Sequence, residues 1–248
     1  MKLKDEVAIV TGAAGYIGST TAKKLASEGA NIVVCDMNID GSQRVVEDII
    51  SKGGKATAIQ LDVTNTDSIE NMVKCVIEKY GHIDILINVA GGSERGRNAP
   101  VHNLKEEVIR ETIAVNLLGV IFCSRAVVGY MIERKKGKIV SVASVLGLRG
   151  KRNFSSYSAA KAGVIVFSKT LAMEVGPYNI NVNCVSPGNI PRPGEPNAHI
   201  PTKNYFGRIP TADCVANLIY FLVSDEADFI TGQNYIVDGG ETLGLKGS

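Results

Sequence analysis

The sequence lacks the residue clusters that mark a metal site or a disulfide framework. Its five cysteines are scattered, with no C-x-x-C pair and no histidine at ligand spacing, and its three histidines are equally scattered. No segment approaches the roughly 20 consecutive apolar residues of a membrane-spanning helix, or the apolar core of a secretory signal peptide. We therefore expect a cytoplasmic protein with reduced thiols, no bound metal ion and no membrane partner.

A strong excess of one charge is also absent. Lys and Arg total 27 and Asp and Glu total 25, so the net charge of +2 gives no reason to expect a nucleic-acid partner. With 248 residues, of which 45% are hydrophobic and 21% charged, the chain has the composition of a globular protein with a sizeable core.

Short β-branched apolar runs alternate with longer segments of helical period. The runs predict strands at 7–10, 31–35, 56–61, 83–87, 138–142, 181–185 and 235–237. The intervening segments predict helices at 17–28, 40–52, 66–80, 104–130, 157–175 and 211–224. This alternation predicts a single α/β domain, residues 1–248, in which a doubly wound, Rossmann-type parallel sheet of about seven strands carries helices on both faces.

A glycine-rich turn follows the first predicted strand. The sequence Thr-Gly-Ala-Ala-Gly-Tyr-Ile-Gly occupies 11–18, directly before a predicted helix. Glycines at three-residue steps allow a sharp turn and a close approach of backbone N–H groups to a pyrophosphate, and the helix N-terminus adds partial positive charge. Such a turn can be purely structural, but its place in the first βαβ unit favours a dinucleotide site. The residues expected at the phosphates are Gly12, Gly15, Tyr16, Ile17 and Gly18.

An acid closes the second predicted strand. Asp36 lies 18 residues after Gly18, where a carboxylate accepts hydrogen bonds from the ribose hydroxyls of an adenosine and repels a 2′-phosphate. A solvated acid at a strand end is the alternative. No Arg or Lys occurs in the glycine turn or directly after Asp36, so we predict NAD(H) rather than NADP(H) as the cofactor.

Tyr157 and Lys161 are four residues apart in a predicted helix and therefore share one face. A free phenol has a pKa of about 10, too high for a base at neutral pH. Lowering that pKa by about 3 units takes about 4 kcal/mol, which a cation about 4 Å away supplies at an effective dielectric constant of about 20. The spacing suits acid–base catalysis by the phenol, although incidental Y-x-x-x-K pairs are common on helix surfaces.

Further motifs surround this pair in a fixed order. Ser144 lies 13 residues before Tyr157, and Asn116 lies 41 residues before it. The other motifs are Asn88-Val89-Ala90-Gly91, Asp62-Val63, Pro187-Gly188 and Val237-Asp238-Gly239-Gly240. Together they resemble the short-chain dehydrogenase/reductase family over nearly the whole chain. Within its short-chain branch the sequence is similar to 3-oxoacyl carrier-protein reductases and to bacterial alcohol and steroid dehydrogenases.

This resemblance implies an enzyme that interconverts a secondary alcohol and a ketone. Tyr157 would be the acid/base, Lys161 would lower its pKa and hold the nicotinamide ribose, and Ser144 would hydrogen-bond the substrate oxygen. Asn116 would anchor a water of a proton relay. The family's usual form is a homotetramer, which we expect here. Further cofactor contacts are expected from Asp62, Val63, Asn88, Ala90, Gly91, Pro187, Gly188 and Ile190, in addition to Tyr157 and Lys161.

The sequence departs from the family pattern at three places. Most short members have the second turn glycine where Tyr16 stands, and the spacing seen here is more typical of the sugar-nucleotide branch. Val89 replaces the second Asn of N-N-A-G, and Arg192 stands where a threonine is common. Two alternatives stay open: sugar-nucleotide epimerisation or dehydration, which the short chain opposes, and a nucleotide-sensing regulator without catalysis, which the intact catalytic residues oppose.

The segment 188–210 has no clear period and is rich in Pro, Gly and polar residues, as is typical of a substrate-binding loop. With 92–98 and 145–153 it should border the ligand site. We expect these basic loops to favour an acidic substrate, or one carried on coenzyme A or an acidic carrier protein; solvated loop charges are the alternative. The loops contain Arg95, Arg97, Arg149, Lys151, Arg152, Arg192, Lys203 and Arg208, against Glu94 and Glu195.

Overall fold

All seven expected strands are present in the computed structural model, which describes residues 2–93, 96–194 and 204–244. They pair in parallel in the order β3-β2-β1-β4-β5-β6-β7. The order reverses between β1 and β4, and doubly wound sheets bind their ligands beyond the carboxyl ends of the strands at such a point. The strands are β1 (Val7–Thr11), β2 (Asn31–Asp36), β3 (Lys55–Gln60), β4 (Ile85–Asn88), β5 (Gly137–Val142), β6 (Ile180–Pro187) and β7 (Asn234–Val237).

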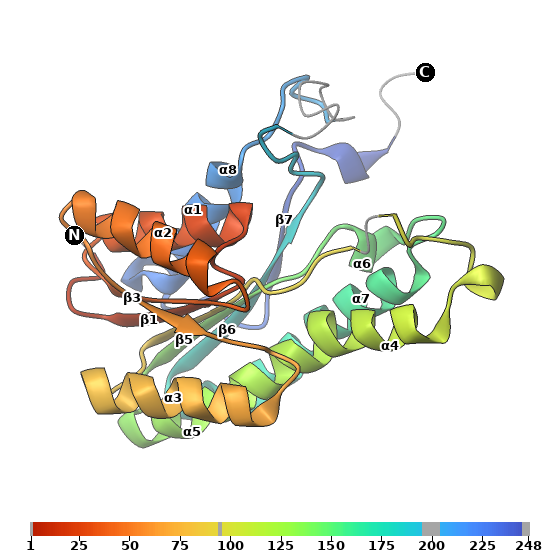
Figure 1. Cartoon of the computed structure of the whole chain (residues 1–248). Helices are drawn as coiled ribbons and strands as arrows, with labels where there is room; N and C mark the ends of the chain where they lie inside the picture. The colour runs from red at the N-terminus through yellow and green to blue at the C-terminus, as the bar shows by residue number, and fades with distance from the viewer. Residues whose placement is uncertain (1, 94–95, 195–203, 245–248) are drawn as a thin grey trace.

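The helices cover both faces of the sheet, as expected (Figure 1). On one face lie α1 (Tyr16–Ser27), α2 (Ile39–Ser51) and α8 (Ala212–Val223). On the other lie α3 (Thr66–Tyr80), α4 (Glu106–Ile113), α5 (Gly119–Arg134) and α7 (Ser155–Val175). The structure also contains α6 (Leu146–Arg149), a π-helical segment η2 (Ala114–Leu118), and the short 3-10 turns η1 (Val101–Asn103), η3 (Gly176–Tyr178), η4 (Asp225–Ala227) and η5 (Glu241–Leu243).

Side chains that alternate along each central strand form two separate cores. In β1, Ala8 and Val10 pack under α1 and α8, whereas Val7 and Ile9 pack toward α3 and α5. Every residue of β1 is buried. Burial on both faces explains why the strands read as unbroken apolar runs in the sequence.

The helical run Glu106–Arg134 corrects the expectation that no segment is long and apolar enough to span a membrane. Its 29 residues include an 18-residue window with a mean hydropathy of 1.8, of which 39% is buried, so by length and composition alone it is apolar enough to cross a membrane. A single helix of this kind is weak evidence, because core helices of water-soluble proteins pass the same test. Here Cys123, Val127 and Met131 of α5 pack fully buried against the sheet.

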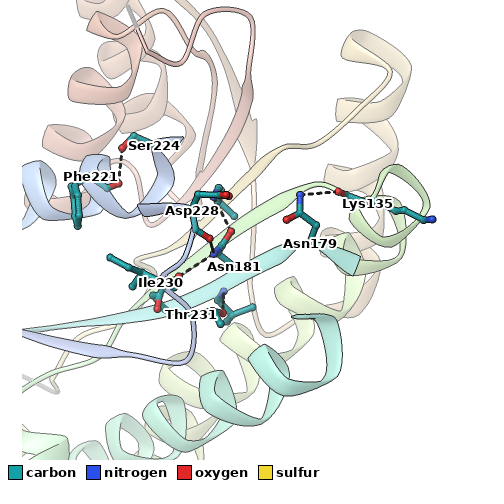
Figure 2. A network of polar contacts seen from close by, with 11 residues as sticks. Lys135, Asn179, Asn181, Phe221, Ser224, Asp228, Ile230 and Thr231 are labelled. Atoms are coloured by element: carbon teal, nitrogen blue, oxygen red, sulfur yellow. Dashed lines mark hydrogen bonds and ion pairs between the residues drawn. The ribbon is translucent and has the colours of Figure 1, made fainter. Parts of the chain in front are cut away.

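Polar side chains tie the loop before β7 to strand β6, at the amino end of the sheet (Figure 2). The Asn181 amide donates to the carbonyls of Asp228 and Ile230, at 2.7 and 3.0 Å, and its oxygen accepts from the Lys138 ammonium at 2.7 Å. The neighbouring Asn183 amide also donates to the Ile230 carbonyl, at 2.8 Å. The carbonyls of Asp228 and Ile230 lie outside the strands, so these side-chain hydrogen bonds satisfy them and hold the edge strand β7 in place.

We predict that Asn181→Ala lowers the free energy of unfolding by about 1–2 kcal/mol, because the Asp228 carbonyl loses its side-chain donor, and the Ile230 carbonyl and the Lys138 ammonium each lose one of two partners. Asn179→Gly is a matched control. The exposed Asn179 makes one bond of 3.4 Å and has a φ of 59°, a conformation that glycine adopts easily. Urea denaturation measures both variants, and equal losses would contradict the stabilising role of the Asn181 contacts.

Candidate active site

One cleft of about 2250 Å³ lies at the carboxyl ends of the strands. It is lined by every predicted catalytic residue and by every predicted cofactor residue except Asn88. The fold therefore brings together residues from segments that are far apart in the sequence. They are Gly12, Gly15, Tyr16, Ile17, Gly18, Asp36, Asp62, Val63, Ala90, Gly91, Asn116, Ser144, Tyr157, Lys161, Pro187, Gly188 and Ile190.

The glycine turn packs too closely for any other residue. Gly12 has a φ of +64°, and a Cβ there would lie 2.7 Å from the Ala90 backbone, while a Cβ at Gly18 would lie 2.2 Å from the Gly12 carbonyl oxygen. Helix α1 begins beside the cleft at Tyr16, and within the described residues no side chain caps its N-terminus. A pyrophosphate would supply the missing acceptors, so the turn fits the phosphate group of a dinucleotide.

Asp36 is held in the cleft wall by backbone N–H groups on both sides. Its Oδ2 accepts from the N–H of Ala14 and its Oδ1 from the N–H of Asn38, both at 3.0 Å. Each carboxylate oxygen keeps a further acceptor position, which suits the paired hydroxyls of a ribose. Met37 and Asn38 continue the wall without a positive charge.

The segment after β3 forms the next part of the wall. The Asp62 Oδ1 accepts from the N–H and the hydroxyl of Thr64, at 2.8 and 2.7 Å. Val63 packs on the start of α5, where a Cβ added to Gly119 would lie 2.7 Å from its Cγ2. These contacts fix Asp62 and Val63 in the wall of the cleft.

The Asn88 side chain lies behind the cleft. It is 2% exposed, and its amide donates to the hydroxyls of Ser124 and Ser141, at 3.2 and 3.3 Å. The side chain therefore ties β4 to α5 and β5, and a contact of Asn88 with the cofactor stays a prediction. The Thr11 hydroxyl accepts from the N–H groups of Val89 and Ala90, so β1 holds the chain that reaches the cleft after β4.

Asn116 lies in η2, which divides the predicted helix 104–130. Its Oδ1 accepts from the Gly92 N–H at 2.9 Å, and its Nδ2 donates to the carbonyls of Gly92 and Thr112 at 3.1 and 3.0 Å. The amide thus pins the loop after β4 to a helix whose turn is locally widened, a feature frequent at functional sites. Both N–H donors of the amide are therefore occupied, whereas Oδ1 keeps one acceptor position, and the water of the predicted relay stays a prediction.

Tyr157, Lys161 and Ser144 form one cluster. The Lys161 Nζ lies 5.8 Å from the centroid of the Tyr157 ring and donates to the Val142 carbonyl at 2.8 Å. The Ser144 hydroxyl accepts from the Leu146 N–H at 3.1 Å and lies near enough to the Tyr157 phenol to lower its pKa. The end of β5 and the first turns of α7 therefore position all three groups together.

Burial sets the charge of both ionisable groups. It raises the pKa of Tyr157, which the hydrogen bond with Ser144 opposes, and it lowers the pKa of Lys161 to about 8. With the protein's own groups alone the phenol therefore stays protonated at neutral pH. This corrects the expectation that Lys161 by itself makes Tyr157 ionisable, and leaves Tyr157 in the form that can donate a proton.

The carboxyl ends of β5, β6 and β7 are joined beside this cluster. The Val145 N–H donates to the Pro187 carbonyl at 3.1 Å, and the Gly188 N–H donates to the Val237 carbonyl at 2.9 Å. Ile190 packs against the apolar core and lines the cleft. The Pro187-Gly188 turn is therefore held at the same end of the cleft as the Tyr157 side chain.

Two of the predicted basic residues are paired with acids. Arg97 contacts Glu111 at 2.8 Å, and Arg149 contacts Glu241 at 2.6 Å. Both acids lie outside the three loops that the sequence analysis expects around the ligand site. The charges of those loops alone therefore overstate the positive charge around the cleft. Lys151 and Arg192 also line the cleft, whereas Arg152 and Arg208 do not. Outside the described residues lie Glu94, Arg95, Glu195 and Lys203.

Among residues 2–93, 96–194 and 204–244, no group of three or more His, Cys, Asp or Glu side chains is placed to hold a metal ion. The cysteines are unpaired, and burial raises the pKa of the Cys35, Cys123 and Cys184 thiols.

Residues 12–242 match a family model described as enoyl-(acyl carrier protein) reductase. The chain belongs to the short-chain dehydrogenase/reductase family. The family suggested by the sequence motifs is therefore confirmed.

Known short-chain dehydrogenases/reductases resemble this one over nearly its full length. The 3-oxoacyl-(acyl-carrier-protein) reductase FabG of Thermotoga maritima is 39% identical over 97% of this chain and 99% of its own. A trans-4-hydroxycyclohexanecarboxylate dehydrogenase of Sinomonas cyclohexanicum is 36% identical over 98% of this chain and 95% of its own. The crystal structure of gox2181 superposes with a TM-score of 0.90, at 32% identity and 98% coverage of both chains.

Some cleft residues of this short-chain dehydrogenase/reductase were not singled out by its motifs. Glu241 and Thr242 directly follow the D-G-G segment, and both line the cleft. The Asp238 carboxylate accepts from the N–H groups of Gly240 and Thr242, at 2.8 and 2.7 Å, and so folds this turn toward the strand ends. The position of D-G-G at a strand end is the sequence signal that could have identified them.

Lys161→Met should be more stable than the wild type at pH 7, because the folded wild type holds a buried ammonium that the unfolded chain keeps in water. The folded-state pKa of Lys161 is about 8 against an ordinary 10.5, so between these values the unfolded chain binds more protons. The wild type therefore gains stability as the pH rises through this window. The difference in free energy of unfolding between Lys161→Met and the wild type becomes smaller.

Chemical denaturation at pH 7 and at about pH 10 measures this gap. Lys169→Met is the matched control, since Lys169 is an exposed lysine on the same helix and should show no narrowing. A gap for Lys161→Met that is constant with pH would contradict the lowered pKa of Lys161.

Proposed function

We propose that this protein is an NAD(H)-dependent cytoplasmic oxidoreductase that interconverts a secondary alcohol and a ketone. The observation that carries the proposal is the Ser144–Tyr157–Lys161 cluster, which lies in the same cleft as the uncapped N-terminus of α1. Oxidoreductases acting on hydroxyl groups are the known relatives of this chain. They favour this reaction over epimerisation, dehydration or a non-catalytic sensor.

Each side chain of the cluster has a distinct task. Tyr157, protonated at neutral pH, donates its proton to the carbonyl oxygen, and Ser144 orients that oxygen and stabilises its developing charge. Lys161 is fixed by the Val142 carbonyl beside the phenol and provides the nearby positive charge. The glycine turn would hold the pyrophosphate of the dinucleotide and Asp36 its adenosine ribose, and the nicotinamide would supply the hydride in reduction and accept it in oxidation.

Asp36 supports the choice of NAD(H). Its fixed carboxylate would accept hydrogen bonds from ribose hydroxyls and repel a 2′-phosphate. We predict a kcat/KM about 100-fold higher with NADH than with NADPH, which corresponds to about 2.7 kcal/mol.

Asp36→Asn should narrow this preference at least about tenfold, because it removes the negative charge and keeps the shape. Asp62→Asn is the control in the same cleft and should affect both cofactors equally. Steady-state kinetics with each cofactor measures the ratio; equal or better turnover of the wild type with NADPH would defeat the assignment.

Tyr157→Phe removes only the phenol oxygen. Turnover of ketones should fall at least about 1000-fold, whereas the affinity for NADH, measured by fluorescence titration, should change by less than about twofold. Retained turnover would remove Tyr157 from its proposed role, and lost NADH binding would show a structural effect instead.

The substrate is proposed to be acidic, or carried on coenzyme A or an acidic carrier protein. Arg149, Lys151 and Arg192 at the cleft support this class, although Glu241 neutralises one of them. A homotetramer is the proposed assembly. Exposed apolar side chains on η2, α5 and α7 support it, namely Leu118, Tyr130, Val166 and Met173.

A further inference from the structure

The basic residues at the cleft differ in how their charge is held. Arg97 and Arg149 each contact a carboxylate, at 2.8 and 2.6 Å, so an incoming anion has to compete with Glu111 or Glu241. A guanidinium already paired in this way gains little from a second anion, because the first has cancelled most of its charge.

Lys151 lines the same cleft and is held without such a partner. Within the described residues, the Lys151 ammonium contacts the Phe154 ring, with its Nζ 4.7 Å from the ring centroid. A cation over an aromatic face is attracted by the quadrupole of the ring and keeps its full charge. The ammonium also keeps its three N–H donors for a ligand, since the ring accepts through its face.

The backbone connects Lys151 firmly to the catalytic cluster. The Phe154 N–H donates to the Lys151 carbonyl at 3.1 Å and closes a turn, in which Asn153 has a φ of 69°. The Phe154 carbonyl then accepts from the Ser158 N–H at 2.8 Å, in the first turn of α7 that also carries Tyr157. The lysine, its aromatic support and the phenol therefore belong to one continuous hydrogen-bonded segment.

We propose that Lys151, supported by Phe154, is the specificity-determining residue that binds a carboxylate or other anionic group of the substrate. This inference rests on the proposed oxidoreductase function and assigns its preference for acidic substrates to one side chain. The anionic group binds the Lys151 ammonium while the carbonyl carbon lies at Tyr157. The number of carbon atoms between the anionic group and the carbonyl carbon of the substrate then determines which acids react.

The test compares a series of straight-chain oxo-acids of increasing length, each with its uncharged methyl ester. For the wild type at low salt, kcat/KM should favour the acid over its ester at one or more lengths. Lys151→Gln should reduce this ratio about fivefold to tenfold by raising KM for the acid, and should change kcat/KM for the ester less than about twofold. Lys151→Arg should restore the preference because it keeps the charge.

Three control variants separate Lys151 from other charges. Arg149→Gln and Arg192→Gln test the other cations at the same end of the cleft, and Lys105→Gln removes an exposed lysine outside it. In the first two variants the ratio should fall less than in Lys151→Gln, and in Lys105→Gln it should stay within about twofold of the wild type. A loss that follows Arg149 or Arg192 instead of Lys151, or an equal loss for acid and ester, would overturn the inference.

Calorimetric binding of the same oxo-acids, with NAD+ present so that they cannot be reduced, provides a measurement that does not need turnover. Lys151-dependent binding without reduction of any ketone would defeat the proposed function and support the inference. Reduction of ketones with no preference of the wild type for acids, in rate or in binding, would support the function and overturn the inference.

Discussion

The position of one buried ammonium determines how this cleft works. Lys161 is 3% exposed and donates to the Val142 carbonyl at the end of β5, which holds it beside the Tyr157 ring. This contact requires that α7 begin where β5 ends and that α6 pack tightly between them. Gly147 permits that packing, since a Cβ there would lie 2.7 Å from the Lys161 carbonyl carbon. The catalytic cluster is thus a consequence of strand-to-helix packing.

Burial explains why the cluster needs a cofactor to act as a base. Desolvation raises the pKa of Tyr157 and lowers that of Lys161, so both groups resist becoming charged. In reduction the raised pKa of Tyr157 is favourable, because the carbonyl oxygen needs a protonated phenol as its acid. In oxidation the phenol must lose its proton, and the positive charge of a nicotinamide bound next to it would supply the missing stabilisation.

The two ends of the sheet have different tasks. At the carboxyl ends the chain leaves acceptors and donors open to the cleft, as at the N-terminus of α1. At the amino ends polar groups are paired internally, as in the contacts of Asn181, and between Asp84 and the N–H of Val7 and the Arg134 guanidinium. Stability and function are therefore separated along the strand direction, as is typical of doubly wound sheets.

The strands could be predicted because burial on both faces requires continuous apolar runs, and the motifs placed the site residues because each follows a strand end. Interactions between distant residues could not be predicted. Spacing does not reveal that Glu241 neutralises Arg149, 92 residues away, or that the Ser124 and Ser141 hydroxyls engage Asn88. The predicted helix 104–130 is present as the continuous helical run Glu106–Arg134, but its π-helical segment could not be predicted, because the contacts of Asn116 with Gly92 lie outside the helical period.

Titration of tyrosinate absorbance, as a difference between the wild type and Tyr157→Phe, tests the coupling of Tyr157 to its surroundings most directly. In the protein alone, the Tyr157 phenol should titrate above the usual value of about 10. With saturating NAD+, the same phenol should titrate at a lower pH, because the positively charged nicotinamide would then face it. A difference titration that does not change when NAD+ is added would contradict the claim that the bound cofactor makes Tyr157 the acid/base.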